Sequence, residues 1–358
     1  MAAYGSRDDI GDTSAKRARV TLSDVARRAN VSRATASLVL RDSPLVAAQT
    51  RRRVEDAMRQ LDYVAHRGAA GLRTQRSGAV GLIVTDVSNP FFAELTTGVE
   101  ERLDAAGRVV LLGSSGDAPA KQERLLGTMR EYNADGLLLC PAEGTEDGTI
   151  RLLRRQRPPV VLLVRYLPAI EADYVGVDNV IGAERGTAHL IAHGHRRIAF
   201  IGGPSHSSAR RDRLHGYSVA LRHHGLPIDN ALTPTSAPTR DGGLAAIGAV
   251  LALDDPPTAA LCYNDVVAFG VMLGARAAGR VVGRDLAVIG CDDIAEAALW
   301  SPPLTTLSIS PRAIGTEAAD LLLERIARPN EAPRHIILTP TLRVRASCGC
   351  HRQVEEAA

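Results

Sequence analysis

Apolar positions near the N-terminus recur at helical spacing in three short segments. The first segment follows Thr21, which can cap a helix in a capping-box-like arrangement with Asp24. Its apolar positions lie three and four residues apart: Leu22, Val25, Ala26 and Ala29. Asn30 then suits a left-handed turn, because its short polar side chain tolerates this backbone conformation. The pattern predicts a short helix that ends in a sharp reversal of the chain.

A second helix is expected after Ser32, a residue type that caps helices well. Its inward positions are predicted to be Ala36, Val39 and Leu40. Its outward positions are Arg33, Ala34, Ser37 and Leu38. Two short helices, a tight turn and a basic residue that opens the second helix are typical of a helix-turn-helix, whose second helix enters the major groove of DNA. An ordinary helical hairpin fits the same spacing.

A third helix is predicted from Thr50 to Leu61. Its apolar stripe consists of Val54, Ala57, Met58 and Leu61. Four arginines lie outside this stripe: Arg51, Arg52, Arg53 and Arg59. They could contact phosphates, but we expect most of them to form a solvated face.

The pattern changes after Ser77, where short apolar runs alternate with longer helical segments. The runs are VGLIV, VVLLG, GLLLC, PVVLLV, YVGV, RIAFIGG, AALCYN and LAVIG. Strands that alternate with helices predict parallel sheets with both faces covered. The stretch is too long for one small lobe, and two such lobes would form a cleft suited to a small ligand.

Length and composition indicate a globular protein of several folding units. The chain has 358 residues, of which 45% are apolar and 23% are charged. No run approaches the roughly eighteen apolar residues of a membrane span, and the first residues lack the apolar stretch of a secretory signal. We therefore expect a cytoplasmic protein without membrane contact. Residues 1–19 are rich in small and charged residues, and we expect them to be disordered.

Charge is unevenly spread along the chain. Through Arg76 there are 15 Lys and Arg against 8 Asp and Glu, whereas the remainder has 28 against 32. A basic head on a mildly acidic body suggests nucleic acid as a partner for the head, although a solvated basic surface gives the same count.

Motifs that would indicate an enzyme are absent from the sequence. No GxGxxG, GxxxxGK[ST], GxSxG or HExxH occurs, so no cofactor loop or nucleophile–base pair can be assigned, and we expect no cofactor. His189 and His193 are four residues apart on an expected helix, a spacing that suits a metal ion, but no acidic motif accompanies them. Cys348 and Cys350 are spaced too tightly for an ordinary zinc knuckle. We expect no metal site.

The segment from Val20 to Leu72 resembles the headpiece of the LacI/GalR family of bacterial repressors. The resemblance implies three helices and then a hinge helix, which lies in the minor groove and wedges a leucine between base pairs. The residues that it places at or beside the operator are Thr21, Leu22, Ser32, Arg33, Ala34, Thr35, Ser37, Leu38, Thr50, His66, Ala69 and Leu72. Among these, Arg33, Ala34 and Leu38 stand where the family contacts bases.

The same segment departs from the family at several positions. Leu38 replaces a common arginine, and Ala65 stands where proline often introduces the hinge. Gly68 and Gly71 lie within the hinge, where each glycine costs a helix roughly 1 kcal/mol. We expect this hinge to be disordered in the absence of DNA.

Later segments, among them RRIAFIGGP, ARRDRLHGYSVAL and DLAVIGCDD, resemble the effector domain of the same family. The resemblance implies an α/β domain of two lobes, similar to periplasmic binding proteins, with chain crossings near Val175, Leu304 and Arg334. The residues that it places at the effector cleft are Phe91, Phe92, Arg165, Arg213, Asn264, Asp265 and Asp292, with Asp86 as a weaker candidate. Phe92 could equally belong to the core, and Asp265 could cap the next helix.

The expected organisation is an extension (1–19), a helix-turn-helix headpiece (20–64), a hinge (65–76), a two-lobe effector domain (77–348) and a tail (349–358). The family resemblance implies a repressor that binds a near-palindromic operator and responds to a small-molecule effector, most often a sugar. We expect a homodimer, because about ten residues after LRVRASC are too few for a tetramerising heptad segment. A sugar-binding receptor and an α/β enzyme are the alternatives.

Overall fold

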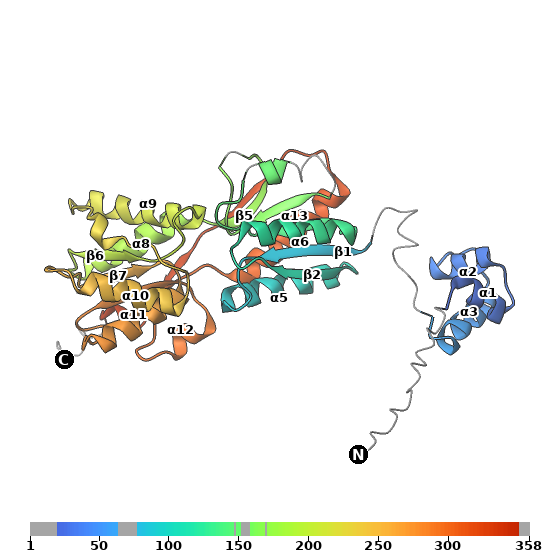
Figure 1. Ribbon diagram of the computed structural model, residues 1–358, viewed down its shortest axis with the longest axis horizontal. Coiled ribbons are helices and arrows are strands. Elements are labelled where there is room, and N and C mark those ends of the chain that lie inside the picture. Colours follow the sequence, from blue (N-terminus) through green and yellow to red (C-terminus); the bar gives the residue numbers. More distant parts are fainter. Residues whose placement is uncertain (1–19, 64–76, 147, 152–157, 169, 351–358) are drawn as a thin grey trace, which may run out of the picture. The chain divides into compact units, whose positions relative to one another are not determined.

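The chain forms two compact units, residues 1–75 and 76–358 (Figure 1). The computed structural model describes residues 20–63, 77–146, 148–151, 158–168 and 170–350. The predicted extension, the hinge and most of the tail lie outside these residues.

Three helices make up the N-terminal unit: α1 (Leu22–Ala29), α2 (Arg33–Leu40) and α3 (Ala48–Gln60). The predicted capping box is present, because Asp24 N–H donates to Thr21 Oγ1 at 3.3 Å and Thr21 N–H donates to Asp24 Oδ2 at 2.9 Å. Asn30 ends α1 with φ 51° and ψ 53°, the predicted left-handed turn. Ser32 caps α2 by accepting a bond of 3.0 Å from Thr35 N–H.

The small core of this unit follows the predicted apolar stripes, with one exception. Its buried members are Val25, Ala26, Ala29, Ala36, Val39, Val54 and Ala57. Leu40 was predicted to face inward, but it is 38% exposed. The reason is that α2 ends at Leu40, and α3 packs more extensively on α1 than on α2.

Two of the four arginines on α3 make bonds within the headpiece, although Arg52, Arg53 and Arg59 are exposed, as expected of a largely solvated face. Arg53 donates to the carbonyl oxygens of Ala29 (2.5 Å) and Asn30 (3.1 Å), where α1 leaves its last carbonyls without helical partners. Arg51 donates to the carbonyl oxygen of Ser43 at 2.7 Å and also pairs with Asp42. Both arginines therefore brace the turns on either side of the α2 helix.

A six-stranded parallel sheet with its helices forms the first lobe of the larger unit. The sheet has the order β10-β5-β4-β3-β1-β2. Its strands are β1 (Ala79–Val84), β2 (Val109–Ser114), β3 (Gly136–Leu139), β4 (Val160–Leu163), β5 (Asp173–Val177) and β10 (His335–Leu338). The helices are α5 (Pro90–Asp104), α6 (Pro119–Glu131) and α13 (Pro311–Ala327).

Alternation along β1 places helices on both faces of this sheet. Leu82 belongs to one buried cluster with Leu95 of α5, whereas Ile83 belongs to another with Met129 of α6. The helices α5 and α13 approach closely at Gly98, where a Cβ atom would lie 2.2 Å from the carbonyl oxygen of Arg312. This crossing requires glycine.

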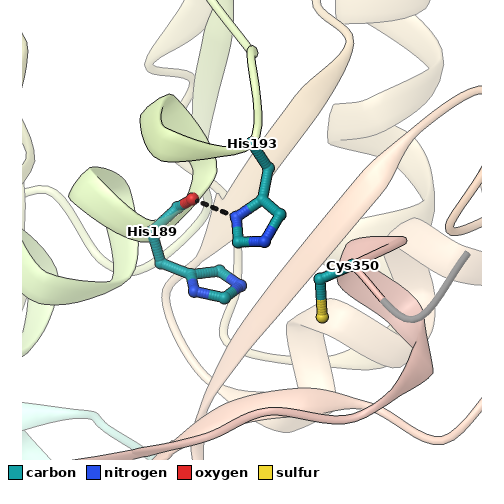
Figure 2. Close-up of side chains that lie close together, drawn as sticks. All are labelled: His189, His193 and Cys350. Atoms are coloured by element: carbon teal, nitrogen blue, oxygen red, sulfur yellow. Dashed lines mark hydrogen bonds between the residues drawn. The ribbon is translucent and has the colours of Figure 1, made fainter. Parts of the chain in front are cut away.

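The second lobe contains a five-stranded sheet of order β11-β9-β8-β7-β6, in which only β11 is antiparallel to its neighbour. Its strands are β6 (Ile198–Ile201), β7 (Ala259–Cys262), β8 (Ala287–Asp292), β9 (Thr305–Ser308) and β11 (Thr341–Arg343). Its helices are α8 (Asn179–Ala192), α9 (Ser208–His223), α10 (Arg240–Leu251), α11 (Asp265–Ala277) and α12 (Ala295–Leu299), with the 3-10 turns η1 (Asn230–Leu232) and η2 (Ala346–Cys348). The turn after η2 brings Cys350 beside His189 of α8 and His193, which caps the C-terminus of α8 (Figure 2).

The chain crosses between the lobes three times, as predicted. The crossings lie at Asp178, between β9 and α13, and between β10 and β11. Each lies a few residues after its predicted position near Val175, Leu304 or Arg334. The short strands β9 and β10 account for two of these offsets, because neither has a long apolar run that reveals it in the sequence. In the described residues, no helix has the length and apolar character needed to span a membrane.

Candidate functional site

The outward face of α2 carries the residues that were predicted to contact bases. Arg33 and Ala34 are exposed, and Ser37 and Leu38 are half-buried, while Ala36 behind them is fully buried. Within the described part of the chain, Arg33 makes no hydrogen bond or ion pair. Its guanidinium is therefore available to an external partner at the start of the helix.

The other predicted DNA contacts have differing local roles. The Thr21 hydroxyl donates to Asp24 Oδ2 at 2.7 Å within the capping box, and Ser32 Oγ lies 2.9 Å from Thr35 Oγ1. Leu22 packs against the headpiece core, and Thr50 is half-buried in the first turn of α3. His66, Ala69 and Leu72 lie outside the described residues. Contact of these residues with DNA stays a prediction.

A cavity of about 610 Å³ lies between the two lobes. The first lobe contributes Thr85, Asp86, Gly116, Asp117 and Glu143. The second lobe contributes Gly203, Pro204, Ser205, Thr235, Ser236, Ala237, Pro238 and Thr239. Several of these residues directly follow β1, β2 or β6, because the carboxyl ends of parallel strands meet at one edge of each sheet.

Arg165 lies behind the cavity surface and binds Asp117, one of the residues that line the cavity. It follows β4, is 6% exposed, and donates to both carboxylate oxygens of Asp117 at 2.6 and 3.1 Å and to the carbonyl oxygen of Pro141 at 3.2 Å. The bidentate pair fixes the Asp117 carboxylate at the cavity surface. Arg165 therefore acts on the cavity through Asp117.

Side chains of the two lobes bond to one another beside the cavity. Glu143 of the first lobe accepts bonds from Ser205 Oγ (3.2 Å) and His206 N–H (2.8 Å) of the second. Tyr166, which follows β4, donates from its N–H to Ser208 Oγ (3.0 Å) and from its hydroxyl to Asp212 (3.1 Å). These bonds would break if the lobes separated, so they favour the closed arrangement.

A buried cation and a buried carboxyl lie inside the second lobe. Arg213 donates to Asn179 Oδ1 at 2.8 Å and lies 4.9 Å from the centre of the Tyr263 ring. Asp292, at the end of β8, receives no hydrogen bond on its side chain from the described residues. Burial and the neighbouring Asp265 raise the pKa of Asp292, while Arg213 opposes the shift. A carboxyl whose pKa is shifted by burial and by a neighbouring carboxyl is common at ligand-binding positions.

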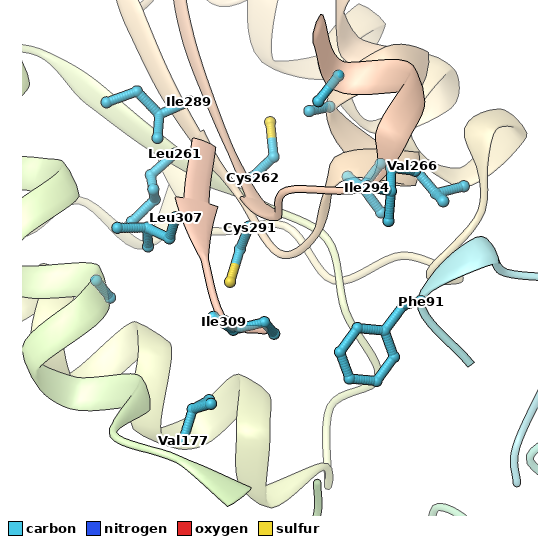
Figure 3. Close-up of a cluster of buried hydrophobic side chains, with 14 of the residues drawn as sticks. Phe91, Val177, Leu261, Cys262, Val266, Ile289, Cys291, Ile294, Leu307 and Ile309 are labelled. Atoms are coloured by element: carbon cyan, nitrogen blue, oxygen red, sulfur yellow. The ribbon is translucent and has the colours of Figure 1, made fainter. Parts of the chain in front are cut away.

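The remaining predicted effector residues take part in packing. The rings of Phe91 and Phe92 meet edge to face at 5.1 Å, and Phe91 lies in the buried cluster that also contains Ile294 and Ile309 (Figure 3). Asn264 caps α11 by accepting a bond from Val267 N–H at 2.8 Å.

Asp265 is fully buried and accepts bonds from Thr306 Oγ1 and from Ile294 N–H at 3.0 Å. None of the seven predicted effector residues is among those that line the cavity, so their contact with an effector stays a prediction. The lining residues Glu143, Ser205, Ser236 and Thr239 were missed, because single polar residues in loops carry no sequence signal. Asp86, the weaker candidate, does line the cavity.

Comparison with known proteins identifies the same two parts of the chain, a helix-turn-helix headpiece and a two-lobe domain. Residues 21–66 match the family described as bacterial regulatory proteins, lacI family, and residues 187–348 match the periplasmic binding protein-like domain. The maltose regulon regulatory protein MalI of Escherichia coli K12 is 32% identical over 333 residues, which cover 90% of this chain and 97% of MalI. The repressor CytR of Escherichia coli K12 is 33% identical over 306 residues, which cover 86% of this chain and 89% of CytR.

Solved structures of related proteins extend over both units. A complex of the transcriptional regulator CelR with cellobiose is 33% identical, with a TM-score of 0.71, and the match covers 92% of this chain and all of CelR. The lac repressor dimer bound to operator and the anti-inducer ONPF is 25% identical, with a TM-score of 0.82, and covers 92% of this chain and 99% of its own. These relatives are transcription regulators rather than enzymes. The chain therefore belongs to the lacI family of bacterial regulatory proteins.

Proposed function

We propose that this protein is a cytoplasmic transcriptional repressor that binds a near-palindromic operator as a homodimer. A neutral sugar or sugar derivative in the cavity between the lobes controls its affinity for DNA. The observation that carries the proposal is the combination, in one chain, of a free arginine on the outward face of a helix-turn-helix and a polar cavity between two lobes.

The shape and chemistry of α2 support the DNA-binding half of the proposal. The helix presents Arg33 in its first turn, where a major-groove helix reaches base edges and where an arginine can donate two bonds to guanine O6 and N7. Leu38 offers apolar contact, which suits a thymine methyl group. The first backbone N–H groups of α2 have no acceptor within the helix and are suited to a phosphate.

The lining of the cavity supports a neutral polyhydroxylated effector. It contains the carboxylates of Asp86, Asp117 and Glu143 together with serine and threonine hydroxyls, and the residues that line it include no Lys or Arg. Carboxylates accept hydrogen bonds from sugar hydroxyls but repel phosphate groups. We therefore favour a neutral sugar over a sugar phosphate, and a nucleoside is the next candidate. Related regulators have been solved with cellobiose and with ribose.

Exposed apolar side chains support dimerisation. Leu244 on α10 and Leu273 on α11 are 42% and 41% exposed, and these two helices pack side by side. On the edge strand β2, Val109 and Leu112 are 50% and 49% exposed. Apolar groups on neighbouring elements are suited to burial against a second copy of the chain, and a related lac repressor was solved as a dimer.

The DNA-binding half is tested by selection of bound sequences from a random duplex pool, repeated at two salt concentrations. We expect enrichment of a short inverted repeat and an affinity that falls steeply with salt, because phosphate contacts release counterions. Salt-dependent binding without enrichment would contradict sequence specificity. Enrichment of a single half-site would contradict binding as a dimer.

The effector half is tested by measuring operator affinity in the presence of neutral sugars, sugar phosphates and nucleosides. We expect a neutral sugar to change the affinity, and the direction of the change distinguishes release from recruitment. Asp86→Asn should weaken the response, whereas Asp104→Asn, at the exposed end of α5, should leave it unchanged. A response to sugar phosphates alone would contradict the proposal that the cavity binds a neutral sugar.

A further inference from the structure

Two short motifs that lie far apart in the sequence meet on the surface of the second lobe. His189 and His193 lie one turn apart at the C-terminal end of α8, and Cys348 and Cys350 flank Gly349 near the C-terminus. One nitrogen of each histidine and the sulfur of Cys350 lie within 4.8 Å of one another. Figure 2 shows the two imidazole rings next to each other, with the Cys350 side chain beside them.

Cys348 lies beside these three donors, although its sulfur is not within 4.8 Å of all of them. Its sulfur lies 3.4 Å from His189 Nε2 and 3.1 Å from the Cys350 sulfur. We propose that His189, His193, Cys348 and Cys350 bind a zinc ion, which ties the C-terminal turn of the chain to the end of α8. Two imidazole nitrogens and two thiolates are a common ligand set of structural zinc sites.

The distances are close to those that zinc requires. Zinc lies about 2.3 Å from sulfur and about 2.0–2.1 Å from nitrogen, so two ligands of a tetrahedral ion are about 3.3–3.8 Å apart. The two sulfurs need to separate by roughly 0.7 Å, and Cys348 needs to come closer to the other donors. Rotation of the half-buried His193 and Cys350 side chains and a small shift of the buried Cys348 would bring the four donors to these distances.

The hydrogen bond of His193 prepares its ring for a metal ion. Nδ1 lies 2.7 Å from the carbonyl oxygen of His189, and a carbonyl oxygen only accepts, so Nδ1 carries the proton and donates. Nε2 is then the nitrogen with the free lone pair. Zinc-bound histidines commonly donate their second nitrogen to a carbonyl oxygen in this way, which fixes the tautomer and the ring orientation.

The backbone also holds the two cysteines in place. Gly349 adopts φ 77°, and a Cβ atom there would lie 2.4 Å from the carbonyl oxygen of Gly283, so only glycine fits. Beside it, Ser347 donates to the carbonyl oxygen of Val288 at 2.7 Å and accepts from Thr305 N–H at 2.7 Å. The turn that carries both thiols is therefore anchored to β8 and β9.

A purely structural role for His193 is the competing explanation, and the chain contains its matched control. His224 ends α9 as His193 ends α8, and its Nδ1 lies 2.8 Å from the carbonyl oxygen of Ala220, four residues earlier. In the described structure, His224 belongs to no cluster of three or more His, Cys, Asp or Glu donors. If His193 served only to end its helix, the two histidines would behave alike toward metal ions.

The test is zinc and cobalt titration of the full-length protein, reduced, stripped with a chelator and free of added histidine tags. We expect one zinc ion per chain and, with Co²⁺, a sulfur-to-cobalt charge-transfer band together with the visible bands of tetrahedral cobalt. His193→Gln and Cys350→Ser should each weaken zinc binding by more than about 100-fold, the upper range for loss of an outer-shell partner alone. His224→Gln should leave the affinity unchanged.

Other outcomes would overturn the proposal. These are failure of the stripped protein to bind zinc, cobalt spectra without the sulfur band, or an equal loss of affinity in His193→Gln and His224→Gln. A Cys348–Cys350 disulfide that persists in reducing buffer would also exclude the site. His193 and Cys350 are only half-buried, so both variants should fold, and circular dichroism with operator binding checks this.

Discussion

The buried carboxyl group of Asp265 makes the stability of the second lobe fall as pH rises. Burial raises the pKa of Asp265 to about 7, although bonds from Thr306 Oγ1 and Ile294 N–H oppose the shift, whereas its ordinary value is 3.8. Between these two values the folded state keeps a proton that the unfolded chain has released. The contribution to stability is therefore complete below the lower value and is lost as pH rises through the upper one.

The size of this effect follows from the two pKa values. Each pKa unit corresponds to about 1.4 kcal/mol, so a shift of about three units lowers the free energy of unfolding by about 4 kcal/mol once both states are ionised. Roughly 3 kcal/mol of this loss falls between pH 5 and pH 8. Asp265→Asn removes the titration and keeps an acceptor for the Ile294 amide. The difference in free energy of unfolding, variant minus wild type, should therefore increase by about 3 kcal/mol over this range.

Urea denaturation followed by tryptophan fluorescence measures this difference. The chain has 1 tryptophan, Trp300, whose ring stacks on Phe269 of the second lobe at 4.3 Å, so the signal reports unfolding of the lobe that contains Asp265. Thr306→Val, which removes a donor to the carboxylate, should steepen the pH profile of the otherwise wild-type protein. A difference that stays flat or decreases from pH 5 to pH 8 would refute the reasoning. Such a result, combined with lost effector affinity, would place Asp265 at the ligand.

Three further predictions concern the two proposed functions. Arg33→Ala should cost about 1–3 kcal/mol of operator affinity and relax specificity at one base position, without changing the melting temperature. An equal loss of affinity for all sequences in filter-binding assays would make Arg33 a phosphate contact. Arg53→Ala should destabilise the headpiece by about 1–2 kcal/mol in thermal unfolding, because the last carbonyls of α1 lose their donor. Unchanged stability with weaker DNA binding would contradict a structural role for Arg53. Asp292→Asn should lower effector affinity at least about tenfold in calorimetry while operator binding is kept, because the amide replaces one of the two acceptor oxygens of the carboxylate with an NH2 donor. A parallel loss of both would indicate a folding role.

The local architecture of the headpiece follows from the sequence alone. The capping box of Thr21 and Asp24, the left-handed Asn30 and the Ser32 cap depend on neighbours within a few residues, so residue type at fixed spacing predicts them. The alternating strands and helices of the two lobes were predicted for the same reason. The exception, Leu40, depended on which helix α3 packs against, and local spacing does not contain that information.

The cavity and the cluster of histidines and cysteines were decided only by tertiary structure. Glu143 and Ser205 meet across the lobes, and His189 and Cys348 meet 159 positions apart, because the chain crosses between the lobes three times and returns its end to α8. The sequence predicted Arg165 and Asp265 as effector-binding residues. In the folded chain, Arg165 instead binds Asp117, and Asp265 is fully buried inside the second lobe. The sequence determines the chemistry of each side chain. Contacts between residues that are distant along the chain determine which of these side chains share a site.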